Sequence, residues 1–451
     1  MMDLKIDIET LAKALGGKLL KGNPRAPFSR FETDSRKVKS GDFFLPLKGL
    51  NYEAHAFLSS TLAAGAGGWI AEILKMPAET PETVITVDNT LKALQTLAAW
   101  HRQRFQIPLT AITGSNGKST TREMLKSIFQ AAGETCSNPG NLNNQFGLPL
   151  SLLELAPAHR FGLFELGASR RGDIKEIGRV ARPTCGIITN IGPSHLQYFG
   201  DMETIFETKT EIADCLAPGG ILIYNYDDQY LSRLNGRKFP KLTFGRSPEA
   251  DLCILEGKNL KIKYDGGIFE INLPHTGGHN YYNAAAAAGA ALASGLDFAA
   301  IRKGLESYTP PPMRLQELRI NGATVILDAY NSNPQSAASA LNEVSNRPKP
   351  LFLMMGDMKE LGKYSGQYHA ELGAALAHTN AEGVFLAGPE MKAAADAFTK
   401  AGGSGLTYAE DLDGWIDRAR ELIAGGEGTF LIKASRSMKF ERIIERVKRY
   451  N

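Results

Sequence analysis

The chain has 451 residues, of which 43% are hydrophobic and 22% are charged, and its formal net charge is +3. This length exceeds what one hydrophobic core supports, so two or three domains are expected, and the near-balanced charge gives no argument for a nucleic-acid partner. No stretch approaches the ~20 apolar residues of a membrane span, and the N-terminus lacks the apolar core of a signal peptide. The four scattered cysteines fit neither a zinc site nor a disulfide framework, so we expect a protein of the reducing cytoplasm without membrane insertion.

Residues 1–84 are expected to form a small mixed α/β domain, which contains the segment TDSRKVKSGDFFLPLKG (33–49). The segment MPAETPET (76–83), with two prolines and acidic residues, is typical of a linker. The apolar positions of LKALQTLAAWHRQRF (91–105) recur at helical spacing, and Pro108 separates this helix from an apolar strand at 109–113.

Residues 85–312 alternate strands with helices, which predicts a central domain built on a parallel sheet. Short apolar runs at 161–166, 184–190 and 220–225 end at polar residues, as strands buried on both faces do. The segment LKIKYDGGIFEINL (260–273) switches to period two around Asp-Gly-Gly and predicts a hairpin. The alanine-rich segment 280–295 predicts a closely packed helix.

The segment YTPPPMR (308–314) predicts a stiff hinge, because three prolines cannot continue a helix. Residues 313–451 then place helical stretches between four apolar runs, which predicts a third, Rossmann-like domain with a doubly wound sheet. Its expected strands lie at 323–328, 350–356, 383–388 and 429–435. No Gly-x-Gly-x-x-Gly turn follows the first of them, so a dinucleotide coenzyme is not expected. The expected fold is therefore α/β with three domains.

The segment TGSNGKST, between the strand at 109–113 and a helical stretch, is typical of a loop that binds nucleotide phosphates. Its spacing is shortened, because Ile112 stands where the first glycine of the common form would be. Backbone N–H groups and the positive end of the helix would face an anion. Lys118 would contact the β- and γ-phosphates, and Ser119 or Thr120 would offer a hydroxyl to Mg²⁺. The alternative is a glycine turn with a solvated lysine. The expected loop residues are Thr113, Gly114, Ser115, Asn116, Gly117, Lys118, Ser119 and Thr120.

Two further side chains follow neighbouring strands and are candidates for binding the metal that a triphosphate needs. Glu165 ends the run 161–166, and His195 follows the run 184–190. In a doubly wound sheet these strand ends share one crevice with the phosphate loop. Taken alone, each has a structural alternative, as a strand-end acid or a core histidine. Lys209, in IFETKTEIA, would by itself be read as a solvated helix lysine.

Together, these motifs resemble those of the Mur ligases, which are ATP-dependent amide-forming enzymes of bacterial peptidoglycan synthesis. The resemblance covers essentially the whole chain. The family has the same shortened phosphate loop, and FELGAS, TNIGPSHL and ETKTEI resemble its metal-binding Glu, its metal-binding His and its carbamylated lysine. The resemblance implies that Glu165, His195 and carbamylated Lys209 support Mg²⁺, of which two ions are expected. GGHNYYNAAAA, PPPMRLQEL and ILDAYNSNP resemble segments that contact the nucleotide and the hinge, which implies ATP contacts from His279, Asn280, Asn283, Arg314 and Asp328.

Within the family, GDMKELG (356–362), IKASRSMKFE (432–441) and NPGNLNNQFGLPLSLL (138–153) resemble the branch that adds D-alanyl-D-alanine to UDP-N-acetylmuramoyl-tripeptide. NYEAH and KAS depart from the common Asp-Gly-His and Lys-Gly-Ser. The resemblance implies that Ser35 and Arg36 contact the uridine nucleotide, with a surface turn as the alternative. It also implies substrate contacts from Asn141, Asn144, Tyr330, Asn331, Asn333, Ser435 and Arg436.

The implied reaction activates the tripeptide carboxylate as an acyl phosphate, which the dipeptide amine then attacks. Small molecules would be the only partners, and a monomer would suffice. The domains would be wide open without ligands and would close when ATP and the nucleotide-sugar substrate are bound. The alternatives are a sister ligase that adds diaminopimelate or lysine, a folylpolyglutamate synthetase, an ATPase without ligation and a non-catalytic nucleotide-sugar module. The sequence leaves open the third residue of the tripeptide and the tolerance for D-Ala-D-lactate.

Overall fold

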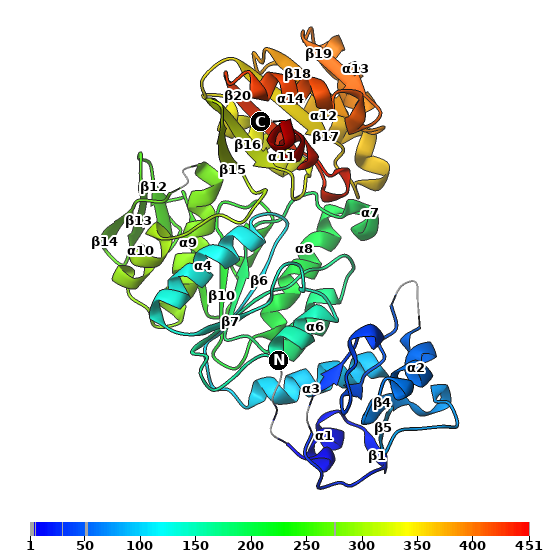
Figure 1. The fold of residues 1–451 in the computed structure, drawn as a ribbon. Coiled ribbons are helices and arrows are strands. Elements are labelled where there is room, and N and C mark those ends of the chain that lie inside the picture. Colours follow the sequence, from blue (N-terminus) through cyan, green and yellow to red (C-terminus); the bar gives the residue numbers. More distant parts are fainter. Residues whose placement is uncertain (1–3, 5, 29, 50–52, 275–276, 451) are drawn as a thin grey trace.

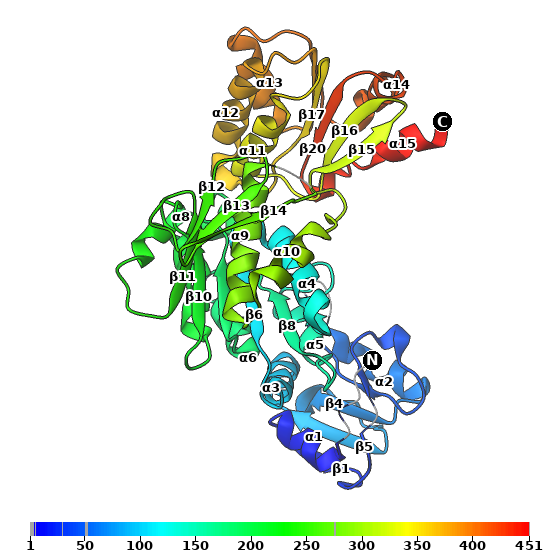
Figure 2. The same ribbon diagram turned by 90° about the vertical axis from the view of Figure 1, so that its left-hand side faces the viewer.

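The computed structural model describes residues 4, 6–28, 30–49, 53–274 and 277–450, which form three β-sheets, each with its own helices. Figures 1 and 2 show three bodies in a row, with the N-terminal part (blue) at one end and the C-terminal part (orange to red) at the other. The expected three-part α/β fold is therefore confirmed. No helix among the described residues is both long and apolar enough to cross a membrane.

The first sheet has the strand order β1-β5-β4-β3-β2, in which only β1 is antiparallel to its neighbour. Its strand β5 begins inside the expected linker, so this sheet continues past residue 84 to Val87. The strands are β1 (Lys18–Lys21), β2 (Phe31–Glu32), β3 (Phe43–Phe44), β4 (Gly68–Glu72) and β5 (Thr83–Val87), with helices α1 (Ile8–Ala14) and α2 (Leu58–Ala63).

Helix α3 (Thr90–Gln103) joins the first part of the chain to the second. Its apolar residues recur at helical spacing, and Leu94, Leu97 and Ala98 are fully buried. It contacts α1 and β4 on one side, and α5 (Gly147–Leu152) and α6 (Asp173–Ala181) on the other. The N-terminal sheet is thus attached to the middle of the molecule through apolar packing.

The middle sheet has the order β14-β13-β12-β11-β10-β9-β6-β8-β7, and β7 to β12 are mutually parallel wherever they pair. Strand β6 is buried throughout and lies between β9 and β8, so the chain reverses its strand order at β6. The strands are β6 (Leu109–Thr113), β7 (Thr135–Ser137), β8 (Phe161–Glu165), β9 (Cys185–Ile188), β10 (Ile221–Asn225), β11 (Lys241–Gly245), β12 (Leu252–Leu255), β13 (Leu260–Tyr264) and β14 (Gly267–Ile271).

Local sequence explains two features of this sheet. The expected hairpin is confirmed as β13–β14, and its turn residues Asp265 and Gly266 have φ of 47° and 75°, which Asp-Gly turns favour. The alanine-rich segment forms α9 (Gly278–Ala293), whose small side chains let it pack against α4 and the strands. The other helices are α4 (Lys118–Ala132), α7 (Leu196–Phe199), α8 (Met202–Thr210) and α10 (Phe298–Glu306).

The third sheet has the order β15-β16-β20-β17-β18-β19, parallel except for the added edge strand β15. Helices on both faces make it the doubly wound unit that the sequence predicts (Figure 2). The strands are β15 (Gln316–Ile320), β16 (Ala323–Asp328), β17 (Leu351–Gly356), β18 (Gly383–Ala387), β19 (Leu406–Ala409) and β20 (Thr429–Lys433), and the helices are α11 (Pro334–Val344), α12 (Ser365–Ala377), α13 (Met391–Lys400), α14 (Ile416–Ala424) and α15 (Arg442–Tyr450).

Candidate active site

The phosphate loop leaves β6 and enters α4 through two tightly packed glycines. Gly114 and Gly117 have φ of 139° and 80°, which L side chains rarely adopt. A Cβ on Gly114 would lie 2.0 Å from Thr189 Oγ1, and a Cβ on Gly117 would lie 2.3 Å from Asn283 Oδ1. Glycine is therefore required at both positions by backbone conformation and by close packing.

Hydrogen bonds from the end of β9 hold the loop in place. Ser115 Oγ donates to Gly192 O over 2.8 Å and accepts from Gly192 N over 2.9 Å. The N–H of Asn116 donates to Asn190 Oδ1 over 3.0 Å. Lys118 Nζ donates to the carbonyls of Gly114 and Ser115, at 2.7 and 3.1 Å. Burial lowers the pKa of Lys118, with a smaller contribution from Arg314 against the opposing effect of Glu165.

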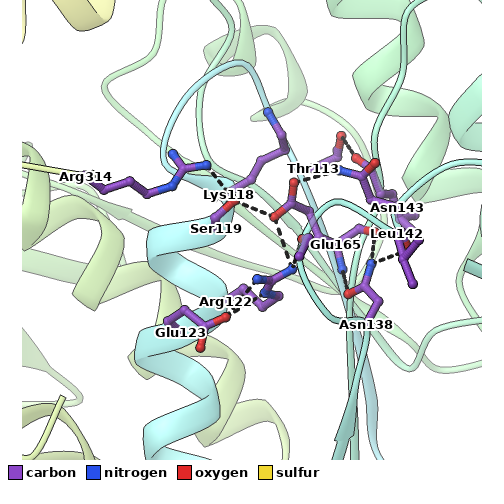
Figure 3. Close-up of polar contacts among 12 residues, drawn as sticks. Thr113, Lys118, Ser119, Arg122, Glu123, Asn138, Leu142, Asn143, Glu165 and Arg314 are labelled. Carbon is purple, nitrogen blue, oxygen red and sulfur yellow. Dashed lines mark hydrogen bonds and ion pairs between the residues drawn. The ribbon is translucent and has the colours of Figure 1, made fainter. Parts of the chain in front are cut away.

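Glu165, the last residue of β8, faces the first turn of α4 (Figure 3). Its carboxylate accepts from Ser119 Oγ over 2.7 Å and from Asn143 Nδ2 over 2.9 Å, and Arg122 Nη1 lies 3.7 Å away. Burial raises the pKa of Glu165, but Lys118 and Arg122 outweigh burial and hold the pKa below its ordinary value. The buried carboxylate is therefore ionised next to the phosphate loop.

Arg314, which follows the proline hinge, reaches the same place from another direction. Its Nη2 donates to Ser119 Oγ over 3.0 Å. Its guanidinium lies 4.1 Å from the centre of the Tyr330 ring, so the hinge arginine stacks on a residue of the C-terminal domain. Arg314 thus brings a cation from the domain boundary to the phosphate loop.

Lys209 is buried in α8, with 1% of its surface exposed, so the reading of a solvated helix lysine is wrong. Burial, reinforced by the charge of Lys118, lowers its pKa to about 7. Glu165, Asp173 and Glu211 oppose this shift without cancelling it. A large share of this amine is therefore unprotonated near neutral pH.

His195 follows β9, adopts a φ of 54° and turns toward the C-terminal domain. Its Nδ1 lies 2.5 Å from Glu360 Oε2, and Gln197 N donates to Glu360 O over 2.9 Å. The segment GDMKELG therefore meets the middle domain at the histidine. Among the described residues, no three His, Cys, Asp or Glu side chains gather as metal ligands, so a metal here would rely on hydroxyl, phosphate or modified-lysine oxygens as well.

A cavity of about 770 Å³ lies over the phosphate loop and extends between the middle and C-terminal domains. Within it, His279 Nε2 is a buried ring atom with no hydrogen-bond partner among the described residues. Burial lowers the pKa of His279. The expected site residues that line this cavity are Ser115, Asn116, Gly117, Lys118, Ser119, Thr120, Glu165, His195, His279, Asn280, Asn283, Arg314, Asp328, Tyr330, Asn331 and Asn333.

Other expected site residues lie elsewhere or have structural partners. Asn144 accepts from Phe146 N and Gly147 N at the start of α5. Ser435 accepts from Lys359 N over 2.9 Å, and Arg436 Nη1 lies 2.9 Å from Glu441 Oε1. The cavity lining also leaves out further expected residues. These are Thr113 and Gly114 at the start of the phosphate loop, Lys209 in α8, Asn141 in the loop before α5, and Ser35 and Arg36 in the 3₁₀ turn Ser35–Lys37 of the N-terminal domain.

Several residues that complete the site were not expected from the sequence. Lys433 is buried, and its Nζ lies 2.6 Å from Asp328 Oδ2. In the sequence it stood out only as part of the motif IKAS. Asn138 holds the backbone of Glu165 on both its N–H and its C=O. The run of asparagines at 138–144 was the available signal for Asn138 and Asn143. Asn190 and Glu360 lie inside TNIGPSHL and GDMKELG but were not singled out there, and no quoted motif contained Arg122 or Gln335.

Comparisons with known proteins agree with this geometry. Residues 112–291 match the Mur ligase middle domain, and residues 313–436 match the Mur ligase glutamate ligase domain. A UDP-N-acetylmuramoyl-tripeptide–D-alanyl-D-alanine ligase from Bacillus subtilis is 33% identical over 98% of both chains. The structure of MurF from Acinetobacter baumannii has a TM-score of 0.91, with 31% identity over 99% of both chains. MurF from Thermotoga maritima in complex with ADP has a TM-score of 0.83, with 27% identity over 93% of this chain and 97% of that one. This chain belongs to the Mur ligase family.

Proposed function

We propose that this protein is the ATP-dependent ligase that joins D-alanyl-D-alanine to UDP-N-acetylmuramoyl-tripeptide. The observation that carries the proposal is the meeting of Lys118, the Ser119–Glu165 pair and Arg314 in one cavity between two domains. Relatives named for this reaction match nearly the full length of the chain.

The polar groups that line the cavity are suited to binding ATP. The phosphate loop would receive the triphosphate, with Lys118 leaving its carbonyl partners for the phosphate oxygens. His279 has a buried ring nitrogen to offer, and Asn283 and Asp328 also face the cavity. We assign His279, Asn280 and Asn283 to the base side, and Asp328 to the ribose or the hinge. The T. maritima relative was crystallised with ADP, which supports the binding of an adenine nucleotide.

The residues present also fit Mg²⁺. A hydroxyl and an ionised carboxylate lie side by side at Ser119 and Glu165, and Mg²⁺ in nucleotide sites takes one or two carboxylates together with phosphates and water. Ser119 or Thr120 would hold one ion, and Glu165 with His195 and carbamylated Lys209 would support a second. Bound Mg²⁺ would neutralise charge on the transferring phosphoryl group.

The proposed ligation has two chemical steps. A carboxylate oxygen of the tripeptide attacks the γ-phosphorus of ATP, the bond to the β-γ bridging oxygen breaks, and ADP leaves. The dipeptide amine then attacks the acyl carbon, loses a proton and expels inorganic phosphate. Negative charge builds up in both steps, and Lys118 and Arg314 are the cations placed to stabilise it.

Lys209 would act as a carbamate. A neutral amine attacks CO₂ to form N–COO⁻ and releases one proton, and the low pKa of Lys209 makes that neutral form available. The product is an anion close enough to Lys118 and Glu165 to interact electrostatically with both. A bare ammonium would repel the cations that the reaction needs.

The three parts of the chain would divide the substrates. We assign the nucleotide-sugar end to the N-terminal domain with Ser35 and Arg36, and ATP to the middle domain. We assign the dipeptide to the C-terminal domain with Tyr330, Asn331, Ser435 and Arg436, and Asn141 and Asn144 to the tripeptide side. Closure of the domains would exclude water from the acyl phosphate. A cytoplasmic location and a monomeric state stay predictions from the sequence.

One assay tests the proposal and its alternatives. Phosphate release is measured with ATP and UDP-N-acetylmuramoyl-tripeptide, with and without D-alanyl-D-alanine, and the product is identified by mass. Release that depends on the dipeptide supports the proposal. Phosphate release that does not depend on the dipeptide indicates an ATPase. Release with diaminopimelate, lysine or glutamate in place of the dipeptide indicates a sister ligase or folylpolyglutamate synthetase. No release indicates a binding module.

A further inference from the structure

Asn116 stands in the middle of the phosphate loop, yet its side chain is bonded to the C-terminal domain. Its Nδ2 donates to Gln335 Oε1 over 2.8 Å, and its Oδ1 accepts from Asn333 Nδ2 over 2.8 Å. Both polar ends of the amide are therefore engaged by residues at the start of α11. An amide held in this way is not available to contact a nucleotide.

The direction of the Asn116 side chain depends on the conformation of the loop. Its carbonyl accepts from Thr189 Oγ1 over 2.5 Å and from Asn190 Nδ2 over 3.1 Å, and its N–H donates to Asn190 Oδ1. These contacts come from the end of β9 and fix the backbone on both sides of the residue. The amide reaches α11 only when the loop keeps this arrangement.

The partners on α11 are equally fixed. Asn333 caps the helix, because its Oδ1 accepts from Ser336 N over 2.9 Å, and this leaves Nδ2 as the group that reaches Asn116. Gln335 lies against the backbone of Gly192. A Cβ added to Gly192 would lie 2.2 Å from Gln335 Oε1. A glycine on the middle domain thus makes room for a glutamine of the C-terminal domain.

We propose that Asn116, Asn333 and Gln335 form an amide clamp that couples the conformation of the phosphate loop to closure of the C-terminal domain. These are positioning residues: neutral hydrogen bonds are short-ranged and directional, so the clamp forms only when loop and domain are both in place. In this proposal Asn116 and Asn333 bind each other. This role takes the place of the nucleotide contact expected for Asn116 and the dipeptide contact expected for Asn333. The role of the clamp in ligation rests on the proposed function, whereas closure can be measured with a nucleotide analogue and without ligation.

Two substitutions of Gln335 separate the hydrogen bond from the bulk of the side chain. Gln335→Leu removes the acceptor and keeps a similar volume, whereas Gln335→Glu keeps an acceptor for Asn116 Nδ2. Loss of one neutral hydrogen bond should lower the ratio of closed to open molecules about threefold to tenfold. Gln335→Glu should restore that ratio. Asn333→Ser keeps a good helix cap, removes the reach to Asn116 and should behave like Gln335→Leu.

Closure is measured by fluorescence energy transfer at saturating Mg²⁺ and the ATP analogue AMP-PNP. Dyes are attached to Lys238→Cys and Lys400→Cys, two exposed positions in the middle and C-terminal domains. The native cysteines are buried. The maximal ligation rate of each variant, measured in parallel, should fall with its closed fraction, because only closed molecules react.

A double-mutant cycle provides the decisive comparison. The effects of Asn116→Ala and Gln335→Leu on closure should be far from additive, because each removes the same bond. Gln229→Leu is the matched control, since Gln229 lines the same cavity from the middle domain, and its effect should add to that of Asn116→Ala. Additive effects of Asn116 and Gln335, or full closure of Gln335→Leu, would overturn the clamp. Failure of dipeptide ligation with the coupling intact would refute the proposed function and leave the clamp standing.

Discussion

Ser119 Oγ donates a 2.7 Å hydrogen bond to Glu165 Oε2, which joins the first turn of α4 to the last residue of β8. The two residues are distant in sequence, and the parallel pairing of β6 with β8 brings them together. A hydroxyl from the first turn of α4 and an ionised carboxylate thus meet in the lining of the cavity. Arg314 reaches the same hydroxyl from the hinge.

Replacing Lys118 with methionine should abolish most ligation without unfolding the protein. The variant keeps the length of the side chain but loses the cation that we propose as the partner of the phosphates. The loss of one such group typically lowers kcat by about a hundredfold to a thousandfold. Steady-state phosphate release measures the effect, and the melting temperature serves as the folding check. Near-normal kcat in a folded Lys118→Met protein would contradict the role of this lysine.

Replacing Glu165 with glutamine should weaken the response to magnesium. Glutamine can still accept from Ser119 but carries no charge, so the Mg²⁺ concentration needed for half-maximal activity should rise about tenfold or more. Magnesium titrations of activity measure the shift. The control is Glu123→Gln, which removes a nearby carboxylate that pairs with Arg122 rather than facing Ser119. Equal magnesium responses in both variants would argue against metal binding at Glu165.

Lys209 should form a carbamate at neutral pH. Its folded-state pKa of about 7 lies below the ordinary value of 10.5, so its neutral, reactive fraction rises as pH increases through 7. With ¹³C-bicarbonate, a carbamate resonance should therefore grow between about pH 6 and 8, well below the range of an ordinary lysine.

The carbamate signal has a matched test. It should vanish in Lys209→Met and persist in Lys92→Met, which changes an exposed helix lysine. Removal of dissolved CO₂ should lower ligation by the unsubstituted enzyme, and added bicarbonate should restore it. A resonance that survives in Lys209→Met would assign the adduct to another amine.

Replacing Gly117 with alanine should destabilise the protein and prevent nucleotide binding. The backbone has a φ of 80°, and the new Cβ would meet Asn283 Oδ1 at 2.3 Å. Strain and overlap together should cost about 2–4 kcal/mol of unfolding free energy. Chemical denaturation measures this cost, and calorimetry with ADP measures binding.

Gly140→Ala separates the two causes of that loss. Gly140 also has a positive φ, of 55°, but a Cβ there would meet no atom within 4 Å. It should cost about 1 kcal/mol, the penalty for the backbone alone. If Gly117→Ala is no more costly than Gly140→Ala, the contact with Asn283 does not restrict the loop.

Much of the site could be predicted from local sequence. The shortened glycine spacing, Lys118 and the apolar strand before the loop together indicate a phosphate site, because the loop's backbone geometry depends on residues close in sequence. Glu165 and His195 could be placed beside it because the ends of parallel strands meet at one edge of a sheet. The end of α10 at Glu306, before the three prolines, and the Asp-Gly hairpin were readable for the same reason: their backbone restrictions are intrinsic.

The chain alone therefore indicated the long buried strands, the loop and the family resemblance, which depend on short stretches of residues. It did not indicate the shorter or more exposed strands β11, β12, β15 and β19. Tertiary structure decided what those residues touch. Only packing buried Lys209 and lowered its pKa, and only the approach of α11 engaged Asn116 with Gln335. Burial and contacts between distant segments follow from how the sheets stack, and no local pattern of hydrophobicity or charge encodes them.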